Sequence, residues 1–452
     1  MNEKIHIYHT NDIHSHFENW PRIQAFLKDR KASHEAAGEE VFIFDIGDFA
    51  DRWHPFTEGT MGKGNVKLLN EAGYTAVTIG NNEGITLPHR DLNEMYEEAE
   101  FDVIAANLYF PDYKKPDWAL PYRIYETKQG RKIAVTGITT YYQKLYELLE
   151  WKLSEPFTEL EIQLNRLKEK TDMIIVLSHL GIHDDEKIAE LFPQVDLILG
   201  GHTHHLFPEG KAAGRSMMAA AGRYGEYIGY VTALLKKNAP KQIQATIYET
   251  ASLPRPINEQ QQIISFDQIG KKQLDIEITT IKETLDFAWD KPSQLPALLC
   301  EALHEWCNAD CSLINSGLVL KSLTKGRVTK YDLHQMLPHP INPCTVELSG
   351  AELKEVLLHA QDASWVNLEL KGLGFRGQVM GTFIFHGIII DKSHHEIYIG
   401  EEPINPDKIY KLGTTDMFTF GKFFPEIRRS RVKHYYMPEF LRDIMAWKLR
   451  QP

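Results

Sequence analysis

Side chains that could bind metal ions recur at five places in this sequence, each soon after a short apolar run. The runs cover residues 4–8, 41–45, 75–79, 173–177 and 195–199, and the polar residues after them include Asp12, His14, Asp48, Asn81, His179, His202 and His204. Carboxylate oxygens and imidazole nitrogens suit zinc, manganese, iron or a similar first-row metal. Two such ions about 3.5–4 Å apart can clamp a phosphoryl group and supply a hydroxide nucleophile. These residue types therefore predict a metal site that acts on phosphoryl groups.

The spacing within the motifs supports a shared site. Asp12 and His14 are two residues apart, as are His202 and His204, and side chains at this spacing on an extended backbone point the same way. The carboxylate of Asp48 could bridge two cations. Any one of these motifs alone is more often an ordinary loop or turn. Five of them in series, each after an apolar run, favour a single functional site.

The elements that carry these motifs alternate between two patterns. Apolar runs, which also occur at 103–106 and 132–136, alternate with stretches of helical spacing such as 64–72 and 157–170. This alternation predicts a layered α/β domain. Ligands of open α/β sheets bind beyond the carboxyl ends of the strands, so we expect the five motifs to meet there. Residues 230–235 and 242–250 are predicted to form a closing β-hairpin.

A change of pattern predicts where the first domain ends. The segment 253–258 contains two prolines and interrupts the alternation, and a polar stretch at 259–290 is predicted to be helical. From residue 291 onward, helical and strand-like stretches mix as in an α+β fold. We therefore predict a catalytic domain at 1–253, a linker and helix at 254–290, and a second domain at 291–452.

Charge and hydropathy argue against several classes of partner. Fifty Lys and Arg against 62 Asp and Glu give a net charge of −12, and no basic block stands out. Binding to nucleic acid or to an anionic membrane is therefore not expected. The first residues lead directly into a strand pattern, without the apolar core of a signal peptide, and no apolar run is long enough to span a bilayer. These features predict a cytoplasmic protein.

The motifs together resemble a known family. His9-Thr10-Asn11-Asp12-Ile13-His14, Gly47-Asp48, Gly80-Asn81, Ser178-His179-Leu180-Gly181 and Gly201-His202-Thr203-His204 are similar in order and spacing to the calcineurin-like metallophosphoesterase domain of the 5′-nucleotidase family. The resemblance covers about the first 235 residues and implies an αββα sandwich. It also implies two divalent metal ions that share Asp48. One ion would take Asp12, His14, Asp48 and His204, and the other would take Asp48, Asn81, His179 and His202.

The second half resembles the substrate-recognition domain of the same family. Ile314-Asn315-Ser316-Gly317, Leu348-Ser349-Gly350 and Thr414-Thr415-Asp416 follow the expected order. In the family this domain supplies arginines that bind phosphate and two aromatic rings that stack on the base. The resemblance implies substrate binding by Asn315 and places Phe375, Phe423 and Phe424 as the candidate rings. The alternative is that these three aromatic residues belong to the core.

Two departures from the family pattern bear on catalysis. The family has a Gly-Asn-His-Glu motif whose His pairs with an Asp three residues on, but here Asn82 and Ile85 occupy those positions. A phosphate-binding arginine of the family is replaced by Leu320. Asn82 can donate a hydrogen bond to substrate but cannot release a proton at neutral pH.

We therefore predict a metal-dependent phosphoesterase, most similar to a 5′-nucleotidase, that releases phosphate from nucleotides with a metal-activated water. Asn81 would be both a ligand and a hydrogen-bond donor to the phosphoryl group, and Asn82 a second donor. Two alternatives remain open. One is hydrolysis of a phosphoanhydride, such as a nucleotide sugar or a dinucleotide, and the other is a non-catalytic relative that binds nucleotide or metal. Metal identity and oligomeric state also stay open.

Overall fold

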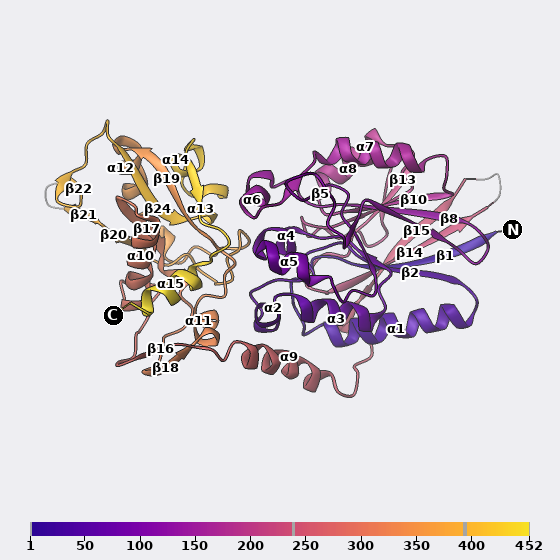
Figure 1. The fold of residues 1–452 in the computed structure, drawn as a ribbon, viewed down its shortest axis with the longest axis horizontal. Coiled ribbons are helices and arrows are strands. Elements are labelled where there is room, and N and C mark those ends of the chain that lie inside the picture. Colours follow the sequence, from indigo (N-terminus) through magenta and orange to yellow (C-terminus); the bar gives the residue numbers. More distant parts are fainter. Residues whose placement is uncertain (1, 237–239, 392–395, 452) are drawn as a thin grey trace. The chain divides into compact units, whose positions relative to one another are not determined.

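The computed structural model describes residues 2–236, 240–391 and 396–451, which form two compact units, Met1–Gly270 and Lys271–Pro452 (Figure 1). The division falls within helix α9 (Glu259–Gln273). The predicted domain bounds at 253 and 291 lie on either side of this division and stay a prediction.

Two large β-sheets form the centre of the first unit. The seven-stranded sheet has the order β15 (Gln242–Glu249), β14 (Tyr227–Leu235), β1 (Glu3–Thr10), β2 (Glu40–Asp45), β3 (Ala76–Val77), β4 (Asp102–Ile104) and β6 (Ala119–Leu120). The six-stranded sheet has the order β12 (Lys211–Ala213), β13 (Ser216–Ala219), β11 (Leu197–Gly200), β10 (Met173–Ser178), β8 (Lys132–Ile138) and β7 (Tyr122–Glu126). A short pair, β5 (Leu108–Tyr109) and β9 (Lys152–Leu153), lies outside both sheets.

The parallel strands carry the motifs. β1 pairs in parallel with β2, and β2 with β3, while β10 pairs in parallel with both β8 and β11. Parallel neighbours end at the same edge, so the segments after them are brought together. The predicted hairpin is confirmed, because β14 and β15 pair in antiparallel register from Tyr227 with Glu249 to Leu234 with Gln242.

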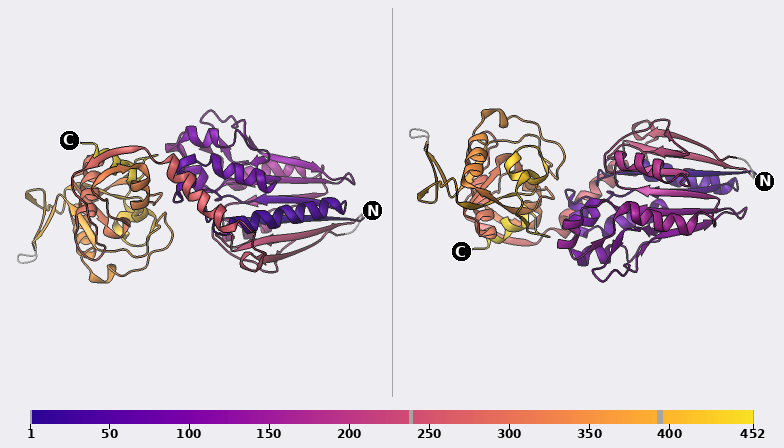
Figure 2. Two further views of the ribbon diagram at one scale, coloured as in Figure 1. Left: turned by 90° about the horizontal axis from the view of Figure 1, so that it is seen from below. Right: turned by 90° about the horizontal axis from the view of Figure 1, so that it is seen from above.

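The two sheets pack face to face around an apolar core. Alternate residues of the strands, among them Ile5, Phe44, Ile175, Leu199 and Val231, are buried in this cluster. The outer face of the second sheet packs on helices α7 (Pro156–Leu167) and α8 (Ile182–Leu191), and α1 (Trp20–Ala36) and α3 (Lys63–Ala72) lie on the opposite side of the unit (Figures 1 and 2). This confirms the predicted αββα sandwich.

Short helices fill the connections of the first unit. They are α2 (Pro55–Thr60), α4 (Asn81–Thr86), α5 (His89–Met95) and α6 (Gln143–Leu148). Helix α9 also packs on this unit, because the ring of Phe266 lies 4.9 Å from that of Phe17 and 5.3 Å from that of Phe56. Glu259 at the start of α9 pairs with Arg22.

The second unit is an α+β domain with its own core, as predicted. Its five-stranded sheet has the order β20 (Phe383–His386), β17 (Cys311–Asn315), β24 (Ile409–Thr415), β19 (Pro343–Ser349) and β25 (Lys433–Tyr435). The smaller sheets are β16 (Glu277–Ile281) with β18 (Gly326–Thr329), and β21 (Ile388–Asp391) with β22 (Glu396–Ile399) and β23 (Glu402–Pro403). The helices are α10 (Gln294–Cys307), α11 (Lys330–Met336), α12 (Gly350–His359), α13 (Met417–Phe420), α14 (Pro425–Arg429) and α15 (Leu441–Leu449).

One predicted element is wrong. The helical stretch expected at 259–290 ends at Gln273, and residues 277–281 form strand β16. The segment Glu277-Ile278-Thr279-Thr280-Ile281 is rich in β-branched residues, which favour strands because their side chains are restricted at χ1. Among the described residues, no helix combines the length and apolar character needed to cross a membrane.

The core between the sheets should determine the stability of the first unit. Ile175 is fully buried there, so Ile175→Ala should lower the free energy of unfolding by about 2–5 kcal/mol through lost burial and a residual cavity. Urea denaturation of the full chain measures this effect. Ile162→Ala on α7, where the side chain is 43% exposed, is the control and should have little effect. Equal losses in both variants would contradict the assigned core.

Candidate metal centre

All seven predicted ligand residues lie beyond the ends of parallel strands of the first unit. Asp12 and His14 follow β1, Asp48 follows β2, and Asn81 begins helix α4 shortly after β3. His179 follows β10 directly, and His202 and His204 follow β11. Six of the seven form two groups whose potential ligand atoms lie within 4.8 Å of one another: Asp12, His14 and His204, and Asp48, His179 and His202.

The first group converges on Asp12. Oδ1 of Asp12 lies 3.8 Å from Nε2 of His14 and 3.5 Å from Nε2 of His204, and these two nitrogens are 3.0 Å apart. Nδ1 of His14 donates to Oδ2 of Asp51 at 3.1 Å, which orients Nε2 toward the group. A metal-binding histidine commonly donates its second nitrogen in this way.

The second group is built around His179. Its Nδ1 donates to the carbonyl of Ile46 at 2.6 Å, and its Nε2 lies 3.4 Å from Oδ2 of Asp48. Nε2 is buried and forms no hydrogen bond with any residue that the structure describes. Such an atom costs free energy unless it finds a partner, and a cation would provide one.

Asp48 connects the two groups. Its Oδ2 lies 3.6 Å from Nε2 of His14 and 3.4 Å from Nε2 of His179. The carboxylate accepts hydrogen bonds at 2.7 Å from both the backbone N–H and the side-chain amide of Asn82. One fixed carboxylate is therefore within reach of both groups of ligands.

Asn81 completes the set of candidate ligands. Its Oδ1 is buried and lacks a hydrogen-bond partner within the described part of the chain. The preceding residue must be glycine, because a Cβ at Gly80 would lie 2.1 Å from Oδ1 of Asp48. Oδ1 of Asn81 and Nε2 of His179 are both available to bind a divalent cation. Their oxygen and nitrogen donors suit a first-row metal.

The backbone that carries these ligands is strained. Five ligand residues have positive φ angles between 50° and 71°, a conformation that costs about 1–3 kcal/mol for a residue with a side chain: Asp12, His14, Asp48, His202 and His204. Hydrogen bonds between the loops hold this geometry. The N–H of His14 donates to the carbonyl of Asp48 at 2.7 Å, and the N–H of Asp12 donates to the carbonyl of Gly47 at 3.0 Å.

The charges of the site are strongly coupled. Burial alone would lower the pKa of His179, but the carboxylates of Asp48 and Asp12 raise that pKa to about 10. Burial opposes ionisation of Asp48, yet His179 and His14 hold the pKa of Asp48 below its usual value. The metal-free site therefore keeps a proton on His179, and a metal ion that binds there must displace it.

Three residues near the site have roles that the motif analysis did not assign. Asp51 orients His14, as described above. Glu83 accepts hydrogen bonds from the backbone N–H groups of Asp48, Ala50 and Gly80 at 2.8–3.0 Å and supports the loop after β2. Its place at the end of Gly80-Asn81-Asn82-Glu83 was a signal that could have found it.

Tyr142 is the third residue. Its hydroxyl lies 3.1 Å from Nε2 of His202, and burial raises its pKa, so the hydroxyl stays protonated at neutral pH. Tyr142 and His202 also line a pocket of about 350 Å³ together with Thr140, Tyr141, Glu155, Pro156, Phe157, Leu180 and Asp184. No sequence motif marked this residue, because the loop between β8 and α6 carries no metal ligand.

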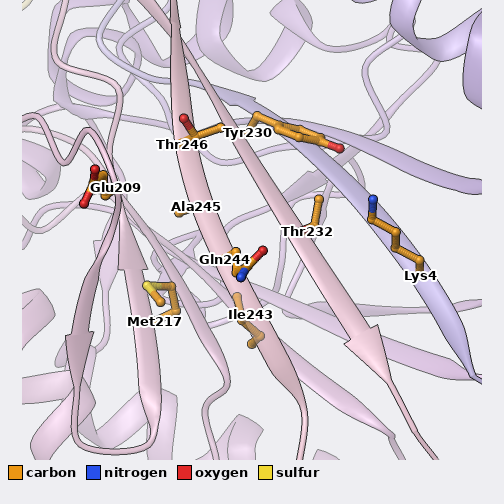
Figure 3. Close-up of a pocket in the computed structure, with 9 residues that line it drawn as sticks. All are labelled: Lys4, Glu209, Met217, Tyr230, Thr232, Ile243, Gln244, Ala245 and Thr246. Carbon is orange, nitrogen blue, oxygen red and sulfur yellow. The ribbon is translucent and has the colours of Figure 1, made fainter.

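A larger hollow of about 490 Å³ lies away from these residues, along β1, β14 and β15 (Figure 3). Its lining includes Gln244 and Thr246 as well as Ile243 and Ala245. Because successive residues of a strand face opposite sides, this hollow extends around the edge strand β15. It contains none of the candidate metal ligands.

In the second unit, two of the predicted aromatic residues lie in the core. Phe424 is fully buried, with ring centroids 5.7 Å from Trp365 and 5.3 Å from both Phe383 and Phe418. Phe375 is 4% exposed and stacks on His339 at 5.1 Å. These contacts favour the structural alternative for both residues.

The other two predicted substrate residues differ in exposure. Phe423 is partly buried against the same core. Asn315 is fully buried, and its Nδ2 donates to the carbonyl of Met380 at 2.8 Å. Substrate binding by Asn315, Phe375, Phe423 and Phe424 stays a prediction.

Comparisons with known proteins agree with the fold. Residues 5–206 match the family model for calcineurin-like phosphoesterase, and residues 277–423 match that for the 5′-nucleotidase C-terminal domain. The chain is 41% identical over 463 residues to the uncharacterized metallophosphoesterase YunD of Bacillus subtilis, covering 100% of both chains. It is 23% identical to the protein UshA of Yersinia enterocolitica, over 92% of this chain and 85% of the relative.

A solved structure has the same fold. NAD nucleotidase of Haemophilus influenzae superposes with a TM-score of 0.68 at 17% identity, covering 99% of this chain and 96% of that one. Together these matches define a phosphoric ester hydrolase whose fold implies divalent metals. The chain belongs to the metallophosphoesterase family, with a calcineurin-like phosphoesterase domain followed by a 5′-nucleotidase C-terminal domain.

Asp48 should be the most sensitive of the ligand residues. Because its carboxylate reaches both groups, Asp48→Ala should reduce metal content and lower phosphate release more than alanine at any single histidine ligand. Metal analysis of the purified protein and a phosphate-release assay measure both effects. Glu18→Ala, which removes an exposed carboxylate paired with His16, is the control. Full hydrolysis in a sample stripped of metal by a chelator would contradict the assignment.

Proposed function

We propose that the protein is a 5′-nucleotidase-type hydrolase that releases phosphate from nucleotides at a centre of two divalent metal ions. The observation that carries this proposal is the position of Asp48, whose Oδ2 lies within 3.6 Å of a nitrogen from each ligand group. A single carboxylate between two sets of ligands is what a pair of ions about 3.5–4 Å apart requires. The match of residues 277–423 to a 5′-nucleotidase C-terminal domain supports a nucleotide as substrate. A cytoplasmic location and a role in nucleotide catabolism stay predictions.

The residues divide into two ligand sets with Asp48 in common. One ion would be held by Asp12, His14, Asp48 and His204, and the other by Asp48, Asn81, His179 and His202. Bound there, the ions would neutralise phosphoryl oxygens and lower the pKa of a water molecule between them. Zinc, manganese and iron all suit these donors.

Residues around the candidate metal centre orient the metal ligands. Asn82 holds the Asp48 carboxylate with two hydrogen bonds, and Asp51 and Ile46 orient His14 and His179 through their second nitrogens. Ligands fixed in this way need not reorganise when substrate binds, which is the main source of electrostatic catalysis. One N–H of the Asn82 amide donates to Asp48 and positions this metal ligand, and donation to substrate from the second N–H stays a prediction.

Hydrolysis of phosphoanhydrides is a second candidate function, and it is favoured by a specific observation. Asn82 replaces the histidine of the family motif, and its Nδ2 donates to Asp48 rather than standing free. A nucleoside 5′-alkoxide is a poor leaving group that profits from a general acid, whose contribution is typically 10²–10⁴-fold. A phosphate or nucleotide departs as a stable anion and needs little protonation. The hydroxyl of Tyr142, 3.1 Å from His202, could donate a hydrogen bond to a leaving group in the pocket that both residues line.

A series of phenyl phosphates with leaving groups of different acidity tests the missing acid. We expect the rate to rise steeply with leaving-group acidity, because Asn82 and Ile85 provide no proton. The measurement is kcat/KM across the series for the wild type and for Tyr142→Phe. If kcat/KM depends more steeply on leaving-group acidity in Tyr142→Phe than in wild type, Tyr142 donates a hydrogen bond to the leaving group. If kcat/KM does not change with leaving-group acidity and nucleoside 5′-monophosphates are hydrolysed rapidly, the site contains a proton donor and this interpretation is wrong.

Removal of the second unit tests where nucleotide preference is determined. The chain should be shortened after Gly270 and not earlier, since α9 packs on Phe17 and Phe56 of the first unit. The shortened protein should keep its metal content and slow hydrolysis of 4-nitrophenyl phosphate but lose preference for nucleotides. Ratios of kcat/KM for a nucleotide and the aryl phosphate measure this. An unchanged ratio would mean that specificity belongs to the first unit.

A further inference from the structure

A second cluster of possible metal ligands lies outside the candidate metal centre. It consists of His6 on β1, His34 in the last turn of α1, and Glu39 just before β2. Oε2 of Glu39 lies 3.3 Å from Nε2 of His6 and 2.7 Å from Nδ1 of His34. One nitrogen from each ring and one carboxylate oxygen thus converge within 4.8 Å.

The opposite nitrogens of both rings already have partners. Nδ1 of His6 lies 2.6 Å from the hydroxyl of Tyr230, and Nε2 of His34 lies 3.0 Å from the hydroxyl of Tyr8. In the metal-free protein Nδ1 of His34 donates to the carboxylate of Glu39, so a metal ion that binds there must displace this proton. With the ion bound, the outer nitrogens would donate to the two hydroxyls and leave lone pairs on the inner nitrogens. Histidines that bind metals are commonly oriented by such outer hydrogen bonds. The two tyrosine rings stack at 4.7 Å, which fixes their hydroxyls.

His6 supplies an independent observation that points to a ligand. Its ring is only 2% exposed, and its Nε2 forms no hydrogen bond with a residue in the described parts of the chain. A buried imidazole nitrogen without a partner costs free energy. Nε2 lies 3.3 Å from Oε2 of Glu39, so a cation bound by both atoms would give Nε2 the partner that it lacks.

We propose that His6, His34 and Glu39 form an additional metal site, suited to Zn²⁺ with water as the fourth ligand. Tetrahedral bonds of about 2.0–2.2 Å place ligand atoms roughly 3.3–3.6 Å apart. The separation of His6 from Glu39 already has this length, whereas that of His34 from Glu39 must increase. The imidazoles of His6 and His34 stack with centroids 3.8 Å apart, so the His34 ring must also turn to place an ion in its plane. The Glu39 side chain is 41% exposed and can move, whereas the His34 ring is 15% exposed and must give up its contact with the hydroxyl of Tyr8 to turn.

This site is separate from the catalytic centre and does not rest on the proposed function. His6 lies within β1 and Asp12 lies beyond its end, and the four steps of extended strand from His6 to Thr10 already span roughly 13 Å. An ion held by His6, His34 and Glu39 would join the end of α1 and the segment before β2 to the first strand. Its role is therefore structural, because a ligand that binds only the folded state stabilises it.

Metal content of the untagged full-length protein tests the proposal. Wild type, Glu39→Gln and His34→Gln are dialysed against micromolar Zn²⁺ and analysed for zinc per chain. Glu35→Gln is the matched control, since it removes an exposed carboxylate from the same helix. We expect Glu39→Gln and His34→Gln each to hold one zinc fewer than wild type and Glu35→Gln, with phosphoesterase activity retained in all.

Thermal unfolding provides a second readout that does not depend on activity. In the Asp48→Ala background, Zn²⁺ should still raise the melting temperature, and the further change Glu39→Gln should make that rise smaller. Equal zinc content in wild type and Glu39→Gln would overturn the proposal and leave the cluster as a hydrogen-bonded network. A zinc-dependent rise that Glu39→Gln leaves undiminished in the Asp48→Ala background would overturn it as well.

Discussion

The position of the Asp48 carboxylate is the constraint on which the catalytic unit depends. Its Oδ2 lies 3.6 Å from a nitrogen of one ligand group and 3.4 Å from a nitrogen of the other. Two features of the fold keep it there. The parallel pairing of β1, β2 and β3 brings the loops that follow them to one edge, and Asn82 holds the carboxylate from the start of α4. Gly80 is needed because any Cβ would overlap the carboxylate.

This arrangement is unfavourable in free energy by itself, and the rest of the unit must stabilise it. Five ligand residues adopt positive φ, and Oδ1 of Asn81 stays buried without a hydrogen-bond partner among the described residues. Such strain persists only where the surrounding structure determines the geometry, and here the apolar core between the sheets does so. Metal binding would relieve part of the cost by giving the Asn81 oxygen a partner. The fold and the metal centre are therefore energetically linked.

Much of the fold could be predicted from local pattern, because buried parallel strands are apolar and polar residues follow them at their carboxyl ends. The same pattern predicted which residues would converge, and six of the seven candidate ligands do form two groups. The strand at Glu277–Ile281 was missed because a short polar segment with β-branched residues has little periodicity to separate it from the helix before it. The hydrogen bond from Asn82 to Asp48 and the burial of Phe424 depend on residues far apart in the sequence. The local sequence pattern does not indicate which distant residues the tertiary fold brings into contact. Tyr142 was missed for the same reason, since only the tertiary fold places its hydroxyl beside His202.

The most direct test of the central claim is anomalous X-ray diffraction from crystals grown with Mn²⁺ and inorganic phosphate. The account predicts two manganese peaks about 3.5–4 Å apart, with the carboxylate of Asp48 between them and phosphate bound to both ions. One peak must lie beside Asp12, His14 and His204, and the other beside Asn81, His179 and His202. A single peak at saturating Mn²⁺, or two peaks that do not share Asp48, would contradict it.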